Sequence, residues 1–254
     1  LISGSRVRIP NSPPCIVIKA LFEIEFFLLD YYSRREDMLD KYNLTKKENV
    51  FLAKKVLVSS IYNSAKLEGI NTTYPDTKTI LDGANVPSLR LDEINCILNL
   101  RDAWNFVLSN IDEAITLDFI CKINSFVSRN ESLEWGVLRT GKVGINGVDY
   151  IPDIPNEAKI IADIKNIMEE KNITRRSLVL MLYLMRTQVF WDGNKRTSMI
   201  VANKIMIENG CGVITIKEEY FKEFNSLLTE YYNTNEIESL LKFLYNNCIF
   251  GMEI

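Results

Sequence analysis

The segment 190–196 combines charged and small side chains around a single glycine. It reads Phe-Trp-Asp-Gly-Asn-Lys-Arg, with helical patterns on both sides. The first amides of the second helix would be unpaired and partly positive, which favours phosphate. Gly193 lets the backbone approach a ligand closely, and Lys195 and Arg196 add full positive charges. Asp192 is a hard oxygen ligand suited to Mg²⁺. The pattern therefore indicates a site for the phosphates of ATP with Mg²⁺.

An ordinary turn explains the same residues. Asp192 and Gly193 would then form the bend, and Asn194 would cap the helix that follows. This composition is common in turns, and from the residues alone the turn is the more frequent explanation.

The elements on either side of this segment read as helices. Apolar residues at helical spacing predict one helix over Thr174–Val189 and another from Lys195 to Gly210. The same reasoning, with caps at Thr45 and Asn156, predicts further helices over Thr45–Glu68, Asp92–Ser109, Thr116–Ser128, Asn156–Glu170, Glu218–Tyr232 and Glu236–Asn247. Val213–Ile216 reads as a short extended piece. The expected fold class is mainly α.

One stretch, Leu138–Ile151, has a different pattern. β-Branched residues surround Gly144 and Asn146-Gly147, and Asn-Gly between extended segments is a strong hairpin signal. We expect a small exposed β-hairpin here.

Composition excludes several classes of function. Net charge is −3 with no strongly basic region, which argues against a nucleic-acid partner. The absence of histidine removes every mechanism built on imidazole, including His-ligated zinc. Five scattered cysteines indicate reduced thiols in a cytoplasmic protein. Charged residues interrupt the apolar stretch Cys15–Tyr32, which therefore predicts a core helix and no membrane span.

The segment Gln188–Arg196 resembles the signature of the Fic (Fic/Doc) family, His-Pro-Phe-x-Asp/Glu-Gly-Asn-Gly/Lys-Arg. The matching residues, in order and spacing, are Phe190, Asp192, Gly193, Asn194, Lys195 and Arg196. The resemblance covers about Ser59–Ile249, including the family's flap hairpin at Gly136–Arg139 and Val143–Pro155, the helix before its core at Asp92–Leu108, and its C-terminal stretch at Phe243–Ile249.

This resemblance implies a Fic-fold helical domain with a β-hairpin flap and an N-terminal helical extension. We expect an irregular segment and helix over 1–44, an inhibitory-helix region over 45–91, and a Fic core with flap and C-terminal helices over 92–254.

The resemblance also implies an activity, namely transfer of AMP from ATP to a Ser, Thr or Tyr hydroxyl of a protein target. Asp192 would hold Mg²⁺, and the helix-start amides of Gly193–Arg196, with the side chains of Asn194 and Arg196, would hold the phosphates. The flap would align the target chain by edge-strand pairing through Gly144, Ile145, Asn146 and Gly147.

The signature has three departures. Gln188 stands where the family carries the proton-accepting histidine. An amide does not accept a proton near pH 7. Losing a positioned base typically lowers the reaction rate by a factor on the order of 10²–10⁴. Lys195 resembles the Doc branch, which transfers phosphate, although Gly193 keeps the Fic form. Met199 stands where many AMP-transferring members carry a second arginine, and the resemblance then implies the loss of a contact to the γ-phosphate.

A second motif lies upstream. Ser64 and Glu68, followed by Gly69, resemble the family's inhibitory helix motif, and their spacing places them on one helix face. In relatives this glutamate reaches a motif arginine and blocks the productive ATP pose. Here Glu68 would pair with Lys195 or Arg196, because Met199 cannot pair with it. The alternative is a solvated glutamate at a helix end.

These observations favour a self-inhibited protein adenylyltransferase that is impaired by Gln188. Two alternatives stay open: a nucleotide-binding pseudoenzyme and a Doc-like protein phosphotransferase. The expected partner is a protein that bears a modifiable hydroxyl, with no nucleic acid and no membrane, and whether the chain forms a homodimer is open.

Overall fold

The computed structural model describes residues 38–252. The chain divides into two units, and the second, Asp40–Ile254, contains the fold described below. The helix expected over Cys15–Tyr32 and the irregular segment before it lie outside the described residues. Within residues 38–252, no helix combines the length and the apolar character that a membrane span requires.

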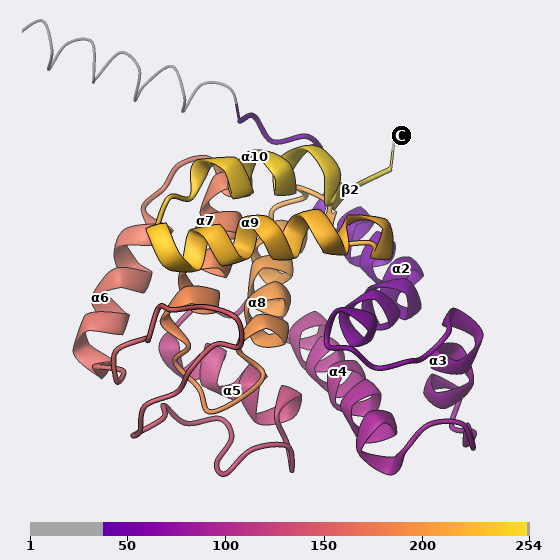
Figure 1. Cartoon of the computed structure of the whole chain (residues 1–254). Coiled ribbons are helices and arrows are strands. Elements are labelled where there is room, and N and C mark those ends of the chain that lie inside the picture. The colour runs from indigo at the N-terminus through magenta and orange to yellow at the C-terminus, as the bar shows by residue number, and fades with distance from the viewer. Residues whose placement is uncertain (1–37, 253–254) are drawn as a thin grey trace, which may run out of the picture. The chain divides into compact units, whose positions relative to one another are not determined.

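The described part of the chain is mainly helical, which confirms the expected fold class (Figure 1). Its helices, in chain order, are α2 (Lys46–Leu67), α3 (Tyr74–Leu81), α4 (Leu91–Ser109), α5 (Leu117–Val127), α6 (Glu157–Met168), α7 (Ile173–Thr187), α8 (Asn194–Glu208), η1 (Glu218–Tyr220), α9 (Phe221–Thr234) and α10 (Glu238–Asn247). Every helix expected within residues 38–252 is present within a few residues of its predicted bounds. The short helix α3, in which only Thr77 and Ile80 are buried, was not expected from the sequence.

Polar caps determine where several helices begin. Thr45 and Glu48 form the capping box expected at α2, because each side chain bonds the backbone amide of the other. Asn156 caps α6, as the sequence predicted, and its side chain accepts a hydrogen bond from Lys159 N. These caps satisfy amides that have no partner inside the helix.

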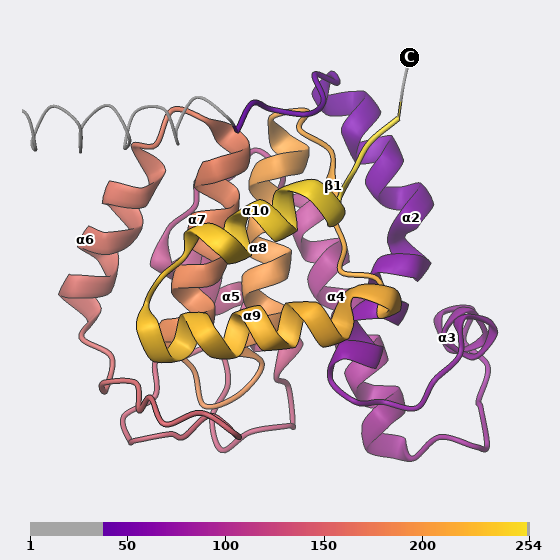
Figure 2. The ribbon, with the colours of Figure 1, turned by 45° about the horizontal axis from the view of Figure 1, so that its top comes forward.

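Helices α7 and α8 form the centre of the unit, and the other helices surround them. α8 is buried along almost its whole length, consistent with apolar residues on more than one face, including Ile200, Val201 and Ile205. α2, α4 and α5 pack against α8, whereas α6 and α10 pack against α7. Figure 2 shows α9 and α10 crossing over this central pair. The loop that precedes α8 is therefore attached to a buried helix.

A two-stranded antiparallel sheet is formed by β1 (Val213–Ile214) and β2 (Ile249–Phe250). Val213 lies opposite Phe250, and Ile214 lies opposite Ile249. The extended piece expected at Val213–Ile216 is thus present, but its pairing with the end of the chain was not foreseen.

The expected hairpin at Leu138–Ile151 contains a turn but no regular strand, so the small sheet lies elsewhere than the sequence suggested. The turn is closed by a hydrogen bond from Val148 N to Ile145 O at 3.2 Å. The carbonyls of Gly141, Pro152 and Asp153 accept hydrogen bonds from a buried arginine in place of a cross-strand ladder. This segment is called the flap below.

Candidate functional site

The loop between α7 and α8 is fixed from within by Asn194. Its carboxamide oxygen accepts from Phe190 N at 2.9 Å, and its Nδ2 donates to Phe190 O at 2.9 Å and to Gln188 Oε1 at 3.1 Å. Phe190 is buried and anchors the loop. The Asn194 side chain, which we expected to contact phosphate, is therefore engaged in holding the loop.

The start of α8 offers unpaired backbone amides. The first hydrogen bond of the helix runs from Thr197 N to Gly193 O at 2.8 Å, so the amides of Asn194, Lys195 and Arg196 precede it. Such amides carry the partial positive charge of the helix end. The feature that the sequence analysis assigned to phosphate is therefore present in the structure.

Gly193 is required by the way this loop meets α5. Its φ is +71°, in the left-handed region, and an added Cβ would clash with Ser128 Oγ and lie 2.8 Å from Cγ1 of Val127. The preceding carbonyl, that of Asp192, accepts from Asn124 Nδ2 at 3.0 Å and from Ser128 Oγ at 2.9 Å. The loop therefore cannot move away from α5 without losing these contacts.

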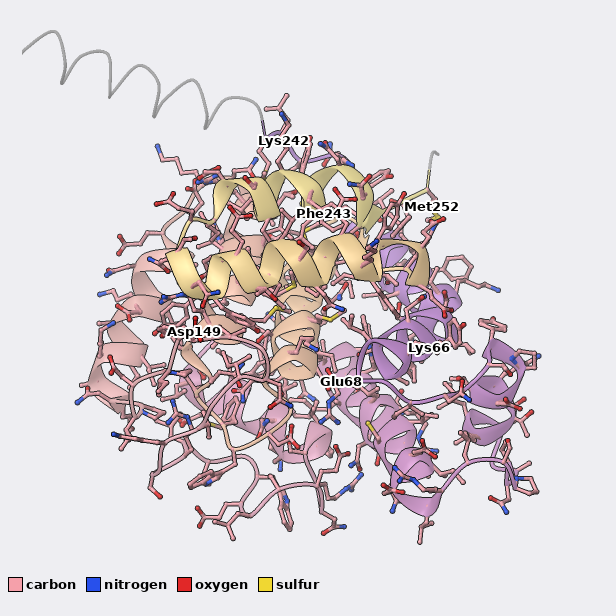
Figure 3. The ribbon with its side chains drawn as sticks, viewed as in Figure 1. Lys66, Glu68, Asp149, Lys242, Phe243 and Met252 are labelled. Atoms are coloured by element: carbon pink, nitrogen blue, oxygen red, sulfur yellow. The ribbon has the colours of Figure 1, made fainter. Side chains whose placement is uncertain are left out.

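Glu68 lies against the charged residues that begin α8. Its Oε1 is 3.5 Å from Lys195 Nζ, and its Oε2 is 3.9 Å from Arg196 Nε. Figure 3 shows Glu68 at the end of α2, facing α8. Ser64 is buried one turn earlier on the same helix. Glu68 as a residue is exposed, but its side chain is turned toward Lys195 and Arg196, the partners that the sequence predicted.

Arg196 is 4% exposed and lies among three carboxylates. Its Nη1 donates to Glu131 Oε2 at 2.6 Å, and its Nη2 is 3.5 Å from Asp192 Oδ1. Burial lowers the pKa of Arg196, but the neighbouring Cys96, Glu68 and Glu131 outweigh that effect and raise the pKa above its ordinary value. The guanidinium is therefore always charged.

Asp192 fits the role of a single carboxylate ligand. Its side chain is half exposed, and Oδ1 accepts a hydrogen bond from Gly193 N at 2.5 Å. Nothing among the described residues hydrogen-bonds its other oxygen, and within residues 38–252 no group of three or more acidic, cysteine or histidine side chains could enclose a metal. Mg²⁺ is commonly bound by one or two carboxylates together with phosphate oxygens, and this donor set suits that arrangement.

A cavity of about 560 Å³ joins these parts. It is lined by Glu68, Val143, Gly144, Ile145, Asn146, Val148, Gln188, Trp191, Asp192, Gly193, Asn194, Lys195, Asn225, Leu228, Thr229 and Tyr232. The inhibitory motif, the flap and the loop, which are far apart in the sequence, thus meet at one cavity. The lining does not include four residues named in the sequence analysis, Ser64, Gly147, Arg196 and Met199. The contribution of α9 was not foreseen.

Arg139 is a residue of this site that sequence reasoning missed. Its side chain is 1% exposed, and its guanidinium donates to Gln188 O, Gly141 O and Asp153 O, each at 2.5 Å. Its backbone amide also donates to Val189 O at 3.0 Å. The arginine therefore joins both ends of the flap to the left-handed end of α7, where Gln188 has φ 47°. The sequence placed Arg139 in a stretch that resembles the family's flap, but gave no sign that its guanidinium is buried.

Comparison with known proteins identifies a domain family in part of this chain. Residues 114–206 match the model of the Fic/DOC family. The chain is 23% identical over 239 residues to a protein adenylyltransferase Fic of Aedes aegypti, covering 90% of this chain and 47% of that protein. It is 24% identical over 234 residues to one of Nematostella vectensis, covering 82% and 53%. The chain thus spans about half the length of these relatives.

Solved structures show the same fold. A fragment of Fic-1 from Caenorhabditis elegans superposes with a TM-score of 0.69 at 18% identity, covering 92% of this chain and 75% of that one. A Fic domain-containing signaling protein from Bacteroides thetaiotaomicron gives a TM-score of 0.67 at 17% identity, covering 85% and 90%. The Fic-fold expectation is confirmed.

Proposed function

We propose that this chain, which carries a Fic/DOC family domain, is a self-inhibited protein adenylyltransferase that Gln188 impairs. The observation that carries the proposal is the position of Glu68 at Lys195 and Arg196, beside the unpaired amides that begin α8. A carboxylate there occupies the place that a phosphate would take, since both are anions attracted by the same groups.

In the proposed reaction, a hydroxyl oxygen of a protein target attacks the α-phosphorus of ATP. A phosphorus–oxygen bond forms, the bond to the β-phosphate breaks, pyrophosphate leaves, and the hydroxyl proton goes to a base. The amides of Asn194, Lys195 and Arg196 would hold phosphate oxygens, and the Lys195 ammonium would add charge to the same site. Asp192 would hold Mg²⁺, which neutralises phosphate charge when bound.

Gln188 is the reason to expect an impaired enzyme. Its Nε2 donates to Met185 O at 2.6 Å and its Oε1 accepts from Asn194, so the side chain is held at the edge of the cavity. A glutamine amide positioned in this way can orient a hydroxyl but cannot take its proton.

Calorimetric titration with ATP and Mg²⁺ tests the nucleotide site. Glu68→Gly should raise the affinity at least about tenfold, because a carboxylate next to phosphate costs more than 1.4 kcal/mol. Asp192→Ala, made in the Glu68→Gly protein, should lower the affinity and remove its dependence on Mg²⁺. Lys195→Met in the same background should weaken binding, whereas Lys242→Met, on an exposed lysine of α10 (Figure 3), should not. Equal affinity in all of these proteins would refute the site.

Shortening the flap tests the role of Gly144, Ile145, Asn146 and Gly147 in docking a target. Within residues 142–151 the structure has one backbone hydrogen bond, Val148 N to Ile145 O, so the remaining amides and carbonyls can pair with an extended peptide. Deleting Asn146 and Gly147 should leave ATP affinity within about twofold of the parent while reducing labelling of an added protein substrate. A large loss of ATP affinity would place the flap in nucleotide binding instead.

Two other functions have specific observations in their favour. Gln188 and the replacement of a second arginine by Met199 favour a pseudoenzyme that binds nucleotide without chemistry. Lys195 favours a Doc-like phosphotransferase, in which label would come from the γ-position of ATP and not from the α-position. A cytoplasmic location, and a protein target with no nucleic acid or membrane partner, remain part of the proposal.

A further inference from the structure

The guanidinium of Arg196 has two edges with different surroundings. Its Nη1 edge is fully engaged, since it donates to Glu131 Oε2 at 2.6 Å, to Cys96 Sγ at 3.1 Å and to Val127 O at 3.4 Å. Its Nε is buried and has no hydrogen-bond partner in the described part of the chain. Glu68 Oε2 is the nearest carboxylate to that atom, at 3.9 Å, beyond hydrogen-bond distance.

A residue of α4 holds Glu131 in place through a hydrogen bond. Its Oε1 accepts a hydrogen bond from Asn99 Nδ2 at 2.8 Å, and Asn99 also donates to the carbonyl of Arg129 at 2.9 Å. Asn99 is 4% exposed and belongs to α4. Arg129 in turn donates to Asn99 Oδ1 at 3.2 Å and pairs with Asp102. Glu131 is therefore anchored through both of its oxygens.

We propose that Glu131, held by Asn99, is a positioning residue that keeps the Nε edge of Arg196 turned toward Glu68, which itself lines the nucleotide cavity. The two glutamates at Arg196 then have separate roles. Glu131 is the permanent partner of one edge, and Glu68 is a loosely placed occupant of the other, which a phosphate oxygen replaces. This inference rests on the proposed function, because it assigns the vacated edge to a phosphate of ATP.

An unfilled donor is the physical reason for this assignment. A buried donor without a partner costs free energy, so an acceptor arriving at Nε would be favoured. Burial raises the pKa of the Cys96 thiol to about 12, so the group beside Nη1 is a neutral thiol and not an anion that could replace Glu131. Without Glu131 the guanidinium would be free to turn its Nη1 side toward Glu68 or Asp192, and the geometry of the Nε edge would be lost.

If Glu131 acted only through its negative charge, its replacement would affect nucleotide binding in the opposite direction to that expected of a positioning residue. This difference can be tested. If Glu131 acted only through its negative charge, Glu131→Gln would strengthen nucleotide binding, and Asn99→Ala would leave it unchanged. Positioning predicts that both variants weaken binding, because a glutamine cannot accept from Arg196 and Asn99 at once, and Asn99→Ala releases the carboxylate without removing its charge.

The experiment uses the full chain with Glu68→Gly as parent, titrated with ATP and Mg²⁺. Glu131→Gln should bind ATP about tenfold more weakly than this parent, Asn99→Ala should show a smaller loss, and Glu131→Asp should recover part of the affinity. Lys242→Met, on an exposed lysine of α10 away from this network, should bind as the parent does. Thermal unfolding separates loss of affinity from loss of the fold.

A second measurement does not need nucleotide. In a ¹⁵N-labelled parent, the Arg196 side chain should show slow rotation of its guanidinium, and Glu131→Gln and Asn99→Ala should each speed that rotation. Unchanged or tighter ATP binding by Glu131→Gln, or unchanged rotation in both variants, would overturn the positioning role. A parent that binds no ATP would instead refute the proposed function, and the inference with it, whatever the variants do.

Discussion

Replacing Gln188 by histidine and Glu68 by glycine in one molecule should give AMP transfer that neither change gives alone. We expect the double variant to label itself from α-labelled ATP at a rate on the order of 10²–10⁴ above the parent, the gain that a positioned base supplies. Each single variant should gain little, because one lacks a base and the other keeps a carboxylate at the phosphate site. Such non-additivity is typical of groups that act on one step.

The structure supports this expectation at position 188. The residue ends α7 with φ 47° and ψ 56°, and its side chain reaches the cavity that Glu68 also lines. Histidine is among the residues that tolerate the left-handed region, and imidazole titrates in the range required of a base near pH 7. Asn194, which now donates to Gln188 Oε1, would face one nitrogen of the new ring.

Labelled nucleotides distinguish the outcomes. The matched control is Gln188→Asn with Glu68→Gly, which keeps an amide and should stay inactive. Label that appears only from γ-labelled ATP would establish the phosphotransferase alternative. No label from either position, with ATP bound, would favour a pseudoenzyme whose defects extend beyond the base, for example to Met199.

Replacing Arg139 by methionine should have the largest effect on stability. The buried guanidinium satisfies carbonyls at Gly141, Asp153 and Gln188, and methionine would leave them without a donor. Losing hydrogen bonds to a charged group at a buried site should lower the free energy of unfolding by about 3 kcal/mol, or roughly 6–12 °C in Tm for a domain of this size.

Thermal and urea unfolding measure this loss. Arg90→Met is the matched control, because the Arg90 side chain is 74% exposed and its ion pairs lie at the surface; it should change the free energy by less than about 0.5 kcal/mol. If Arg139→Met were as mild as the control, the guanidinium would not be what joins the flap to the end of α7.

The helices could be predicted from the sequence because each carries its own apolar periodicity and its own cap. Thr45 with Glu48 begins α2, and Asn156 begins α6, as local patterns indicated. The short helix α3 begins at a capping box of Thr73 and Asp76 that was overlooked, since eight residues give too little periodicity to recognise. The pairing of β1 with β2 joins segments separated by more than thirty residues, and no local pattern predicts it.

The site was predictable where a motif fixes the spacing. Glu68 lies beside Lys195 and Arg196. These are the two partners expected from the sequence, because Met199 cannot form an ion pair with a glutamate. Arg139, Glu131 and Asn99 were not predictable, because their roles depend on partners brought together only by the packing of α4, α5 and the flap. The sequence also led us to expect that the Asn194 carboxamide contacts phosphate. It cannot show that this group is already hydrogen-bonded to Phe190 and Gln188.

The most direct test of the central claim is a crystal structure of the Glu68→Gly variant with ATP and Mg²⁺. Our account predicts phosphate oxygens at the amides of Asn194–Arg196, Mg²⁺ at Asp192, and an oxygen acceptor at Arg196 Nε in the place that Glu68 vacates. A nucleotide bound elsewhere, or with its phosphates turned away from the start of α8, would contradict the account.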